Sequence, residues 1–164
     1  MSTAGTPVDD RRGHVDADGL RVAVIAARFN AEITDSLLRG ACEALAEHGA
    51  RDEDVTTIRV PGAWELPQTA ARAVEVGRFD AVIALGCVIR GETPHFDYVC
   101  QETSLGLGAV ARTAHIPVLF GVLTTDDLAQ AQARAGEGKD NKGYEAAMAA
   151  LDMVFVLRNL RGDG

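Results

Sequence analysis

Residues 81–95 read AVIALGCVIRGETPH, an uninterrupted apolar run that ends in a turn and a helix start. An apolar run such as 81–89 is typical of a strand that is covered on both faces, as the strands of parallel sheets are. Gly91 follows in the turn, and Pro94 opens a helical pattern that extends to about residue 115. This stretch therefore predicts a buried strand followed by a helix, the repeating unit of an α/β fold.

The same alternation continues on both sides of this stretch. Apolar β-type runs alternate with helical patterns, the runs at 20–27, 55–60 and 118–123 and the helices at 33–48, 66–76, 128–135 and 142–160. Strands that alternate with helices predict one parallel sheet between two helix layers. We therefore expect a three-layer α/β/α sandwich with a four-stranded parallel sheet of flavodoxin-like type. It forms a single domain over residues 20–164, preceded by a polar arm at 1–19 that is expected to be flexible.

Charge and cysteine content limit the partners of this chain. Its 24 acidic and 16 basic residues give a net charge of −8, which disfavours nucleic acid and anionic membranes as partners. No apolar stretch has the length of a membrane span or the form of a signal peptide. Cys42, Cys87 and Cys100 lie in apolar stretches without metal-type spacing. We expect a cytoplasmic protein with buried, reduced thiols and no metal site. Since no GxGxxG follows the first strand, we also expect no cofactor.

Ligands of open α/β sheets gather beyond the carboxyl ends of the strands. This rule selects the segments 28–30, 61–65, 90–95 and 124–127. In the third of them, Arg90, Gly91 and Thr93 precede a helix start, where free N–H groups and the helix dipole favour an anion such as phosphate. A tight turn that is merely capped by Thr93 is an equally good interpretation of the local sequence.

Four further side chains at this edge are candidates for a site. His95 lies in a first helical turn, where a neutral imidazole is favoured and can act as a base and then an acid, although a structural histidine fits equally well. Phe29 can stack on a planar heterocycle, but a hydrophobic lid is the commoner role for such a residue. Glu65 can accept hydrogen bonds from hydroxyl groups or simply favour the helix dipole. Asn30, next to Phe29, is included because it follows the same strand.

Several longer stretches occur in the order and spacing of one known family. They are ARFN at 27–30, VPGAWELP at 60–67, ALGCVIRGETPHFDYVCQE at 84–102, FGVLTTDDLAQAQARAG at 120–136 and NKG at 141–143. With them, residues 20–160 resemble the 6,7-dimethyl-8-ribityllumazine synthase family. The resemblance implies a cofactor-free transferase of riboflavin biosynthesis. It would condense 5-amino-6-(D-ribitylamino)uracil with 3,4-dihydroxy-2-butanone 4-phosphate and release phosphate and water.

The resemblance also implies roles for the matching residues. Phe29 would stack on the pyrimidine, and His95 would move protons during the condensation. The ribityl chain and the pyrimidine edge would be held by Ala63, Trp64, Glu65, Val88 and Ile89. The phosphate would be bound by Glu92 and Thr93, with Arg134 as the main counter-charge.

A homopentamer whose sites lie between subunits is the assembly that the resemblance implies, with Phe120, Arg134 and Lys142 supplied by the neighbour. The chain lacks the insertion after Arg134 that we associate with members that stop at pentamers or decamers, so a sixty-subunit shell stays open. Gly106 and Gly108 inside the predicted helix indicate close packing against another helix. Two details depart from many members, namely Asp140 where they have glycine and Trp64 where they have phenylalanine.

Two other classes of protein fit part of this pattern. A flavin- or lumazine-binding protein would use Phe29 but would not need His95 beside Arg134. A scaffold that has lost catalysis would need none of Phe29, Glu65, His95 and Arg134. The presence of all four in one sequence therefore favours a synthase.

Overall fold

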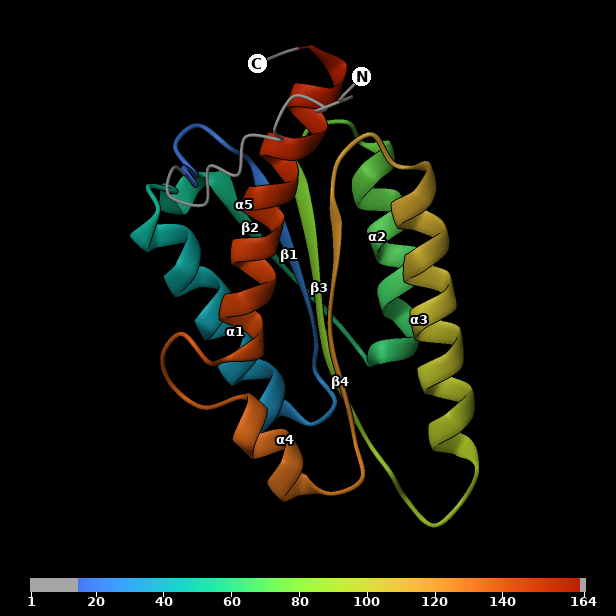
Figure 1. Cartoon of the computed structure of the whole chain (residues 1–164). Helices are drawn as coiled ribbons and strands as arrows, with labels where there is room; N and C mark the ends of the chain where they lie inside the picture. The colour runs from blue at the N-terminus through green and yellow to red at the C-terminus, as the bar shows by residue number, and fades with distance from the viewer. Residues whose placement is uncertain (1–14, 163–164) are drawn as a thin grey trace, which may run out of the picture.

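A computed structural model describes residues 15–162 of the chain, which form an α/β fold (Figure 1). The strands are β1 (Val22–Ala27), β2 (Val55–Val60), β3 (Ala81–Ile89) and β4 (Val118–Thr125). The helices are α1 (Ala31–Glu47), α2 (Leu66–Glu75), α3 (His95–Thr113), α4 (Leu128–Arg134) and α5 (Lys142–Arg161), with short 3-10 helices η1 (Asp52–Asp54) and η2 (Ala63–Glu65). The predicted alternation of strands and helices is confirmed.

The four strands form one parallel sheet in the order β2-β1-β3-β4. The central strands β1 and β3 are buried along almost their whole length, which explains their continuous apolar sequences. β2 and β4 are the edge strands, and they are less buried than β1 and β3, with partly buried or exposed residues among the buried ones. Because all four strands run the same way, their carboxyl ends meet at one edge of the sheet.

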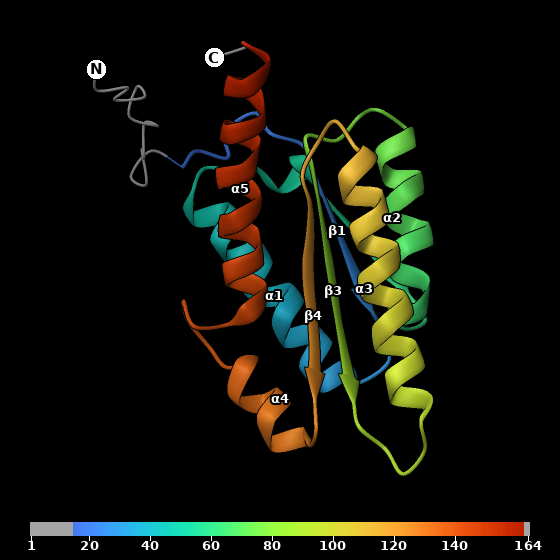
Figure 2. The same cartoon turned by 45° about the vertical axis from the view of Figure 1, so that its right-hand side comes forward.

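Two helix layers cover the sheet, with α1, α4 and α5 on one face and α2 and α3 on the other (Figures 1 and 2). Successive residues of a strand point to opposite faces. Val24 and Ile83 therefore pack with α1 and α5, whereas Ile25 and Val82 pack with α2 and α3. The predicted three-layer, flavodoxin-like sandwich with a four-stranded parallel sheet is confirmed.

The element boundaries differ from prediction by a few residues, each time for a local reason. α1 begins at Ala31 rather than at residue 33, because Asn30 takes a left-handed conformation (φ 59°) and its carbonyl accepts the N–H groups of Ile33 and Thr34. β4 extends to Thr125 because it stays paired with the end of β3, residue Ile89.

Most of the predicted flexible arm, residues 1–14, lies outside the described residues. In the rest of that segment, Ala17 is fully buried and its N–H donates to the carbonyl of His48 at 2.8 Å. Val15 packs against the core between the sheet and α1 and α5. Residues 15–19 are therefore part of the packed structure.

Candidate functional site

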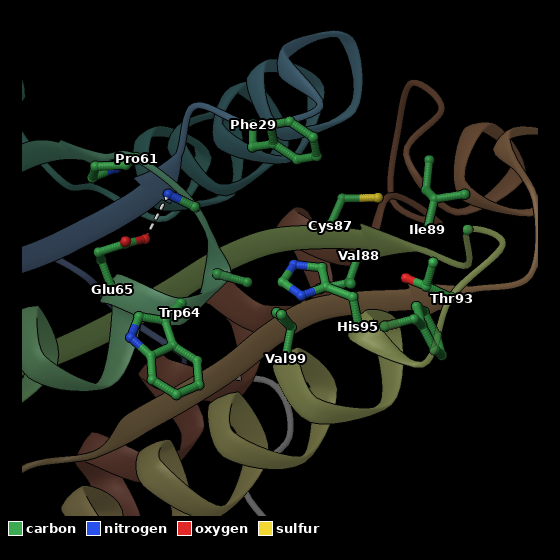
Figure 3. Close-up of a pocket in the computed structure, with 14 residues that line it drawn as sticks. Phe29, Pro61, Trp64, Glu65, Cys87, Val88, Ile89, Thr93, His95 and Val99 are labelled. Atoms are coloured by element: carbon green, nitrogen blue, oxygen red, sulfur yellow. Dashed lines mark hydrogen bonds between the residues drawn. The ribbon is translucent and has the colours of Figure 1, made fainter.

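A pocket of about 480 Å³ lies at the carboxyl ends of β1 and β3, beside η2 and the start of α3 (Figure 3). We call it the Phe29 pocket. It is lined by Phe29, Pro61, Gly62, Ala63, Trp64, Glu65, Cys87, Val88, Ile89, Gly91, Thr93, His95, Phe96 and Val99. The structure thus brings together residues from three of the four segments that the strand-end rule selected.

Phe29 is held at the rim of this pocket by the backbone. The N–H of Arg28 donates to the carbonyl of Val60 at 2.7 Å, and the N–H of Phe29 donates to that of Pro61 at 3.0 Å. These bonds continue the pairing of β1 with β2 beyond the strand ends. Phe29 is 72% exposed and Trp64 is 57% exposed, and both line the pocket (Figure 3). Two exposed rings at one pocket suit a planar apolar ligand.

Glu65 has a structural contact and a place in the pocket wall at the same time. Its Oε2 accepts a hydrogen bond from the N–H of Gly62 at 2.9 Å, which closes the turn of η2 (Figure 3). The place of Glu65 in the pocket wall is compatible with the interpretation that it accepts hydrogen bonds from hydroxyl groups of a ligand. Since this bond fixes the carboxylate, Glu65 is pre-oriented toward whatever occupies the pocket.

The turn between β3 and α3 leaves the start of α3 open to a ligand. Gly91, Thr93 and His95 line the pocket, whereas Glu92 does not. No side chain caps α3, whose N-cap residue is Pro94, so the alternative interpretation of a turn that is capped by Thr93 is wrong. An uncapped helix start has N–H groups and a positive dipole end that suit an anion.

The side chain of Arg90 makes its contacts outside the Phe29 pocket, unlike Gly91, Thr93 and His95. Its Nε donates to Oδ1 of Asp126 at 2.9 Å, its Nη1 lies 3.4 Å from Oδ1 of Asp97, and its guanidinium stacks 4.3 Å from the Phe96 ring centroid. The hydrogen bond with Asp126 and the two negative charges raise the pKa of Arg90. Arg90 does not line the pocket, and its charge is offset by two carboxylates.

Asn30 also makes a contact away from the pocket. Its Nδ2 donates to the carbonyl oxygen of Cys87 at 2.8 Å, which ties the start of α1 to the end of β3. Asn30 therefore helps to shape the edge of the sheet on which Phe29 and Cys87 lie.

A second pocket, of about 420 Å³, lies along the edge strand β4 and the start of α5. We call it the Arg134 pocket. It is lined by Leu119, Phe120, Gly121, Val122, Leu123, Thr124, Arg134, Lys142, Glu145, Ala146 and Ala149. Phe120, Arg134 and Lys142, which the family resemblance assigned to a neighbouring subunit, therefore lie together and away from the Phe29 pocket.

The two cationic side chains of the Arg134 pocket, Arg134 and Lys142, form hydrogen bonds with residues close to them in the sequence. Nη1 of Arg134 donates to the carbonyl of Gln130 at 2.9 Å. Nζ of Lys142 donates to both carboxylate oxygens of Glu145, at 2.9 and 2.8 Å. Glu145 was not predicted from the sequence, although an acid three residues after a lysine on a helix is a recognisable pairing signal.

The walls of the Phe29 pocket include three residues that the sequence analysis did not select, Cys87, Phe96 and Val99. Val99 lies four residues after His95 on α3, so its helical spacing from His95 was an available signal, whereas Phe96, directly after His95, has no such spacing. Cys87 is buried, as predicted, and burial raises the pKa of its thiol to about 11. Cys42 and Cys100 are free but only half-buried, so the prediction of burial was wrong for them.

Residues 15–162 contain no group of three His, Cys, Asp or Glu side chains that could hold a metal ion. Over the same residues, no helix is both long and apolar enough to cross a membrane.

Comparison with known protein families gives one match that covers most of the chain. The model of the family described as 6,7-dimethyl-8-ribityllumazine synthase matches residues 19–158 of 164. This range contains every strand, both pockets and all but the last residues of α5. The chain therefore belongs to the 6,7-dimethyl-8-ribityllumazine synthase family.

Proposed function

We propose that this protein is the lumazine synthase that condenses 5-amino-6-(D-ribitylamino)uracil with 3,4-dihydroxy-2-butanone 4-phosphate. Its family is one of transferases that act in riboflavin biosynthesis. The observation that carries the proposal is the Phe29 pocket, which combines two exposed aromatic rings with His95 and an uncapped helix start. These features match one planar substrate and one phosphorylated substrate.

The pyrimidine would occupy the aromatic side of the pocket. Phe29 would stack on its ring, since an exposed aromatic at a pocket rim gains both burial and stacking energy from a flat heterocycle. The ribityl hydroxyls would donate to Glu65, and the ring edge would lie against the strand end. That strand-end and η2 wall is made by Ala63, Trp64, Val88 and Ile89.

The phosphate would lie at the start of α3. Gly91 has no atom within 4 Å of the position of an added Cβ, so a ligand can approach the backbone of this turn closely. Thr93 and the backbone of Glu92 would donate hydrogen bonds to phosphate oxygens. The strand-end rule also selected Asn30 and Arg90 as candidate binding residues, and their contacts with Cys87, Asp126 and Asp97 favour a supporting role for both.

The reaction needs positioning and proton transfer. The pyrimidine amine attacks the ketone, and loss of water gives an imine. The phosphate group then leaves by elimination, and attack of the second amine closes the ring with loss of another water. His95 would take and return the protons of these steps, which general acid–base groups accelerate by about 10²–10⁴-fold. The proposed reaction involves no cofactor.

A second copy of the chain would complete the site. Among residues 15–162, neither lysine nor arginine lines the Phe29 pocket, and a phosphate there needs a counter-charge. Arg134 and Lys142 lie in the other pocket together with Phe120, which is 48% exposed on an edge strand. A head-to-tail contact would bring the two pockets together, and such contacts form closed rings when the rotation between successive copies closes. We propose a homopentamer, with a sixty-subunit shell as the larger alternative.

The cysteines and the net charge of the chain support a cytoplasmic location and small-molecule substrates. Its three cysteines are free in the structure, which favours the reducing cytoplasm. The net charge of −8 favours small-molecule substrates over nucleic acid or an anionic membrane.

The test is incubation of the purified protein with both substrates, with lumazine fluorescence and phosphate release followed together. We expect the two signals to rise at equal molar rates and to depend on both substrates. Omission of either substrate is the control. Tight binding of the lumazine without any phosphate release would identify a binding protein instead and would contradict the proposal.

A further inference from the structure

One buried amide, that of Asn141, connects α1, the α4–α5 loop and α5. Asn141 is 2% exposed, and both of its polar atoms are fully used. Its Oδ1 accepts the N–H groups of Gly143 at 2.8 Å and Tyr144 at 3.2 Å, which caps α5. Its Nδ2 donates to the carbonyl oxygens of Gly136 at 2.7 Å and Ser36 at 3.2 Å. A cap needs only the oxygen, so the two bonds from the nitrogen serve another purpose.

That purpose is visible at the end of α4, where Arg134 is the last helical residue. Oγ of Ser36 donates to the carbonyl of Ala135 at 2.5 Å, and Nδ2 of Asn141 holds the next carbonyl, that of Gly136. The backbone immediately after Arg134 is therefore fastened to the second turn of α1. Both views of the fold show α4 and the start of α5 beside this part of α1 (Figures 1 and 2).

The start of α5 is fixed against α1 equally closely. A Cβ added to Gly143 would lie 1.9 Å from the carbonyl oxygen of Leu37, and one added to Gly40 would lie 2.3 Å from Oδ1 of Asn141. No side chain fits at either glycine, because Gly143 lies against the backbone of Leu37 and Gly40 lies against the side chain of Asn141. Lys142 lies between Asn141 and Gly143 and is held by the same contact.

We infer that Asn141 is a positioning residue for anion binding, assisted by Ser36. Its side chain fixes the backbone of Arg134 relative to that of Lys142, the two cations that line the Arg134 pocket. A phosphate gains most from two cations when they are already in place, because no entropy is then lost in ordering them. This inference rests on the proposed function, in which the Arg134 pocket supplies the counter-charges for the keto-phosphate.

Two variants separate this role from simple capping of α5. Asn141→Asp keeps the oxygen that caps α5 but cannot donate to Gly136 or Ser36. Ser36→Ala removes only the bond to Ala135 and changes no charge, so a shared effect of the two variants reports on the loop and not on an added carboxylate. Arg134→Gln serves as the reference for loss of the cation itself.

Tyr144→Phe is the matched control for stability. It removes the 2.7 Å bond from the Tyr144 hydroxyl to Glu47, another link between α5 and α1, without touching the α4–α5 loop. The readouts are kcat, KM for each substrate, and the affinity for inorganic phosphate measured by calorimetry on the assembled protein.

We expect Asn141→Asp to raise KM for the keto-phosphate about tenfold and Ser36→Ala about threefold, as expected for the loss of one or two hydrogen bonds. Phosphate affinity should fall in parallel while KM for the pyrimidine stays unchanged. Tyr144→Phe should lower Tm but move neither KM. If Arg134→Gln weakens phosphate binding while neither positioning variant does, or if both KM values rise equally, the inference is wrong. If Arg134→Gln leaves phosphate affinity unchanged, the Arg134 pocket is not the anion site, and the inference and this part of the proposed function both fail.

Discussion

His95 combines a fixed position with a reactive side chain, because it opens α3 and lines the Phe29 pocket (Figure 3). His95→Asn keeps a side chain of similar size that cannot exchange a proton at neutral pH. We expect the single-turnover rate to fall about 10²–10⁴-fold while the pyrimidine binds as in the wild type. His115→Asn, at an exposed position just beyond the end of the same helix, is the control and should leave the rate unchanged. An unaltered rate for His95→Asn at every pH would exclude proton transfer by this residue.

Arg90 presents a choice between two roles that predict opposite results. If Arg90 supports the turn through its ion pair with Asp126, then Asp126→Asn should raise KM for the keto-phosphate about two- to fivefold, the range expected for an exposed ion pair. Arg90→Ala should have a similar effect, and the double variant should be no worse. If Arg90 binds phosphate directly, Asp126→Asn would free the guanidinium and lower this KM. Steady-state kinetics of the three variants distinguish the two roles.

Much of the candidate site could be predicted from the sequence, because its residues follow strand ends and match family motifs. Phe29, Glu65 and His95 were all selected in this way, and they line one pocket. The partners of charged residues could not be predicted. Arg90 pairs with Asp126, which lies on the loop after another strand, and only the folded sheet brings the two together. Distant ion pairs of this kind leave no local pattern in a sequence.

At the level of helices and strands, prediction succeeded where burial imposes a pattern. β1 and β3 are buried on both faces, so their apolar runs predicted both ends of β3 and the carboxyl end of β1, whereas β1 begins two residues later than predicted. It was less successful where one backbone conformation decides, as at Asn30, whose left-handed φ starts α1 earlier than its apolar pattern does. The close packing against another helix that was predicted at Gly106 is confirmed, and the neighbour is Pro67 of α2 in the same chain.

Gly106 and Gly108 make a matched pair within α3. A Cβ on Gly106 would lie 2.8 Å from Cβ and Cγ of Pro67, whereas one on Gly108 would meet only the flexible end of Arg112 at 3.3 Å. Gly106→Ala should therefore cost about 1–3 kcal/mol of unfolding free energy through overpacking. Gly108→Ala should be neutral or add up to about 1 kcal/mol through helix propensity. Urea denaturation at equal protein concentration measures both, and equal effects would contradict this view of the α2–α3 contact.

At the level of the whole molecule, one chain holds the two parts of the proposed site in separate places. The Phe29 pocket opens beside η2 and α3, and the Arg134 pocket opens along β4 and α5. No residue lines both pockets. The sequence of a single chain could not establish how copies associate, because that depends on surfaces that meet only in the assembly. The family resemblance alone suggested the arrangement that we propose, in which each site joins the Phe29 pocket of one copy to the Arg134 pocket of the next.

Complementation between two inactive chains tests this arrangement most directly. One chain carries Glu65→Ala and His95→Ala in the Phe29 pocket, and the other carries Arg134→Ala in the Arg134 pocket. Each alone should be inactive. After the two are unfolded and refolded together in equal amounts, random head-to-tail rings should contain an intact site at about a quarter of their interfaces. We therefore predict that lumazine formation returns to about a quarter of the wild-type rate per site. If the mixture stays inactive although mixed rings form, each chain holds a complete site by itself, and the shared site is wrong.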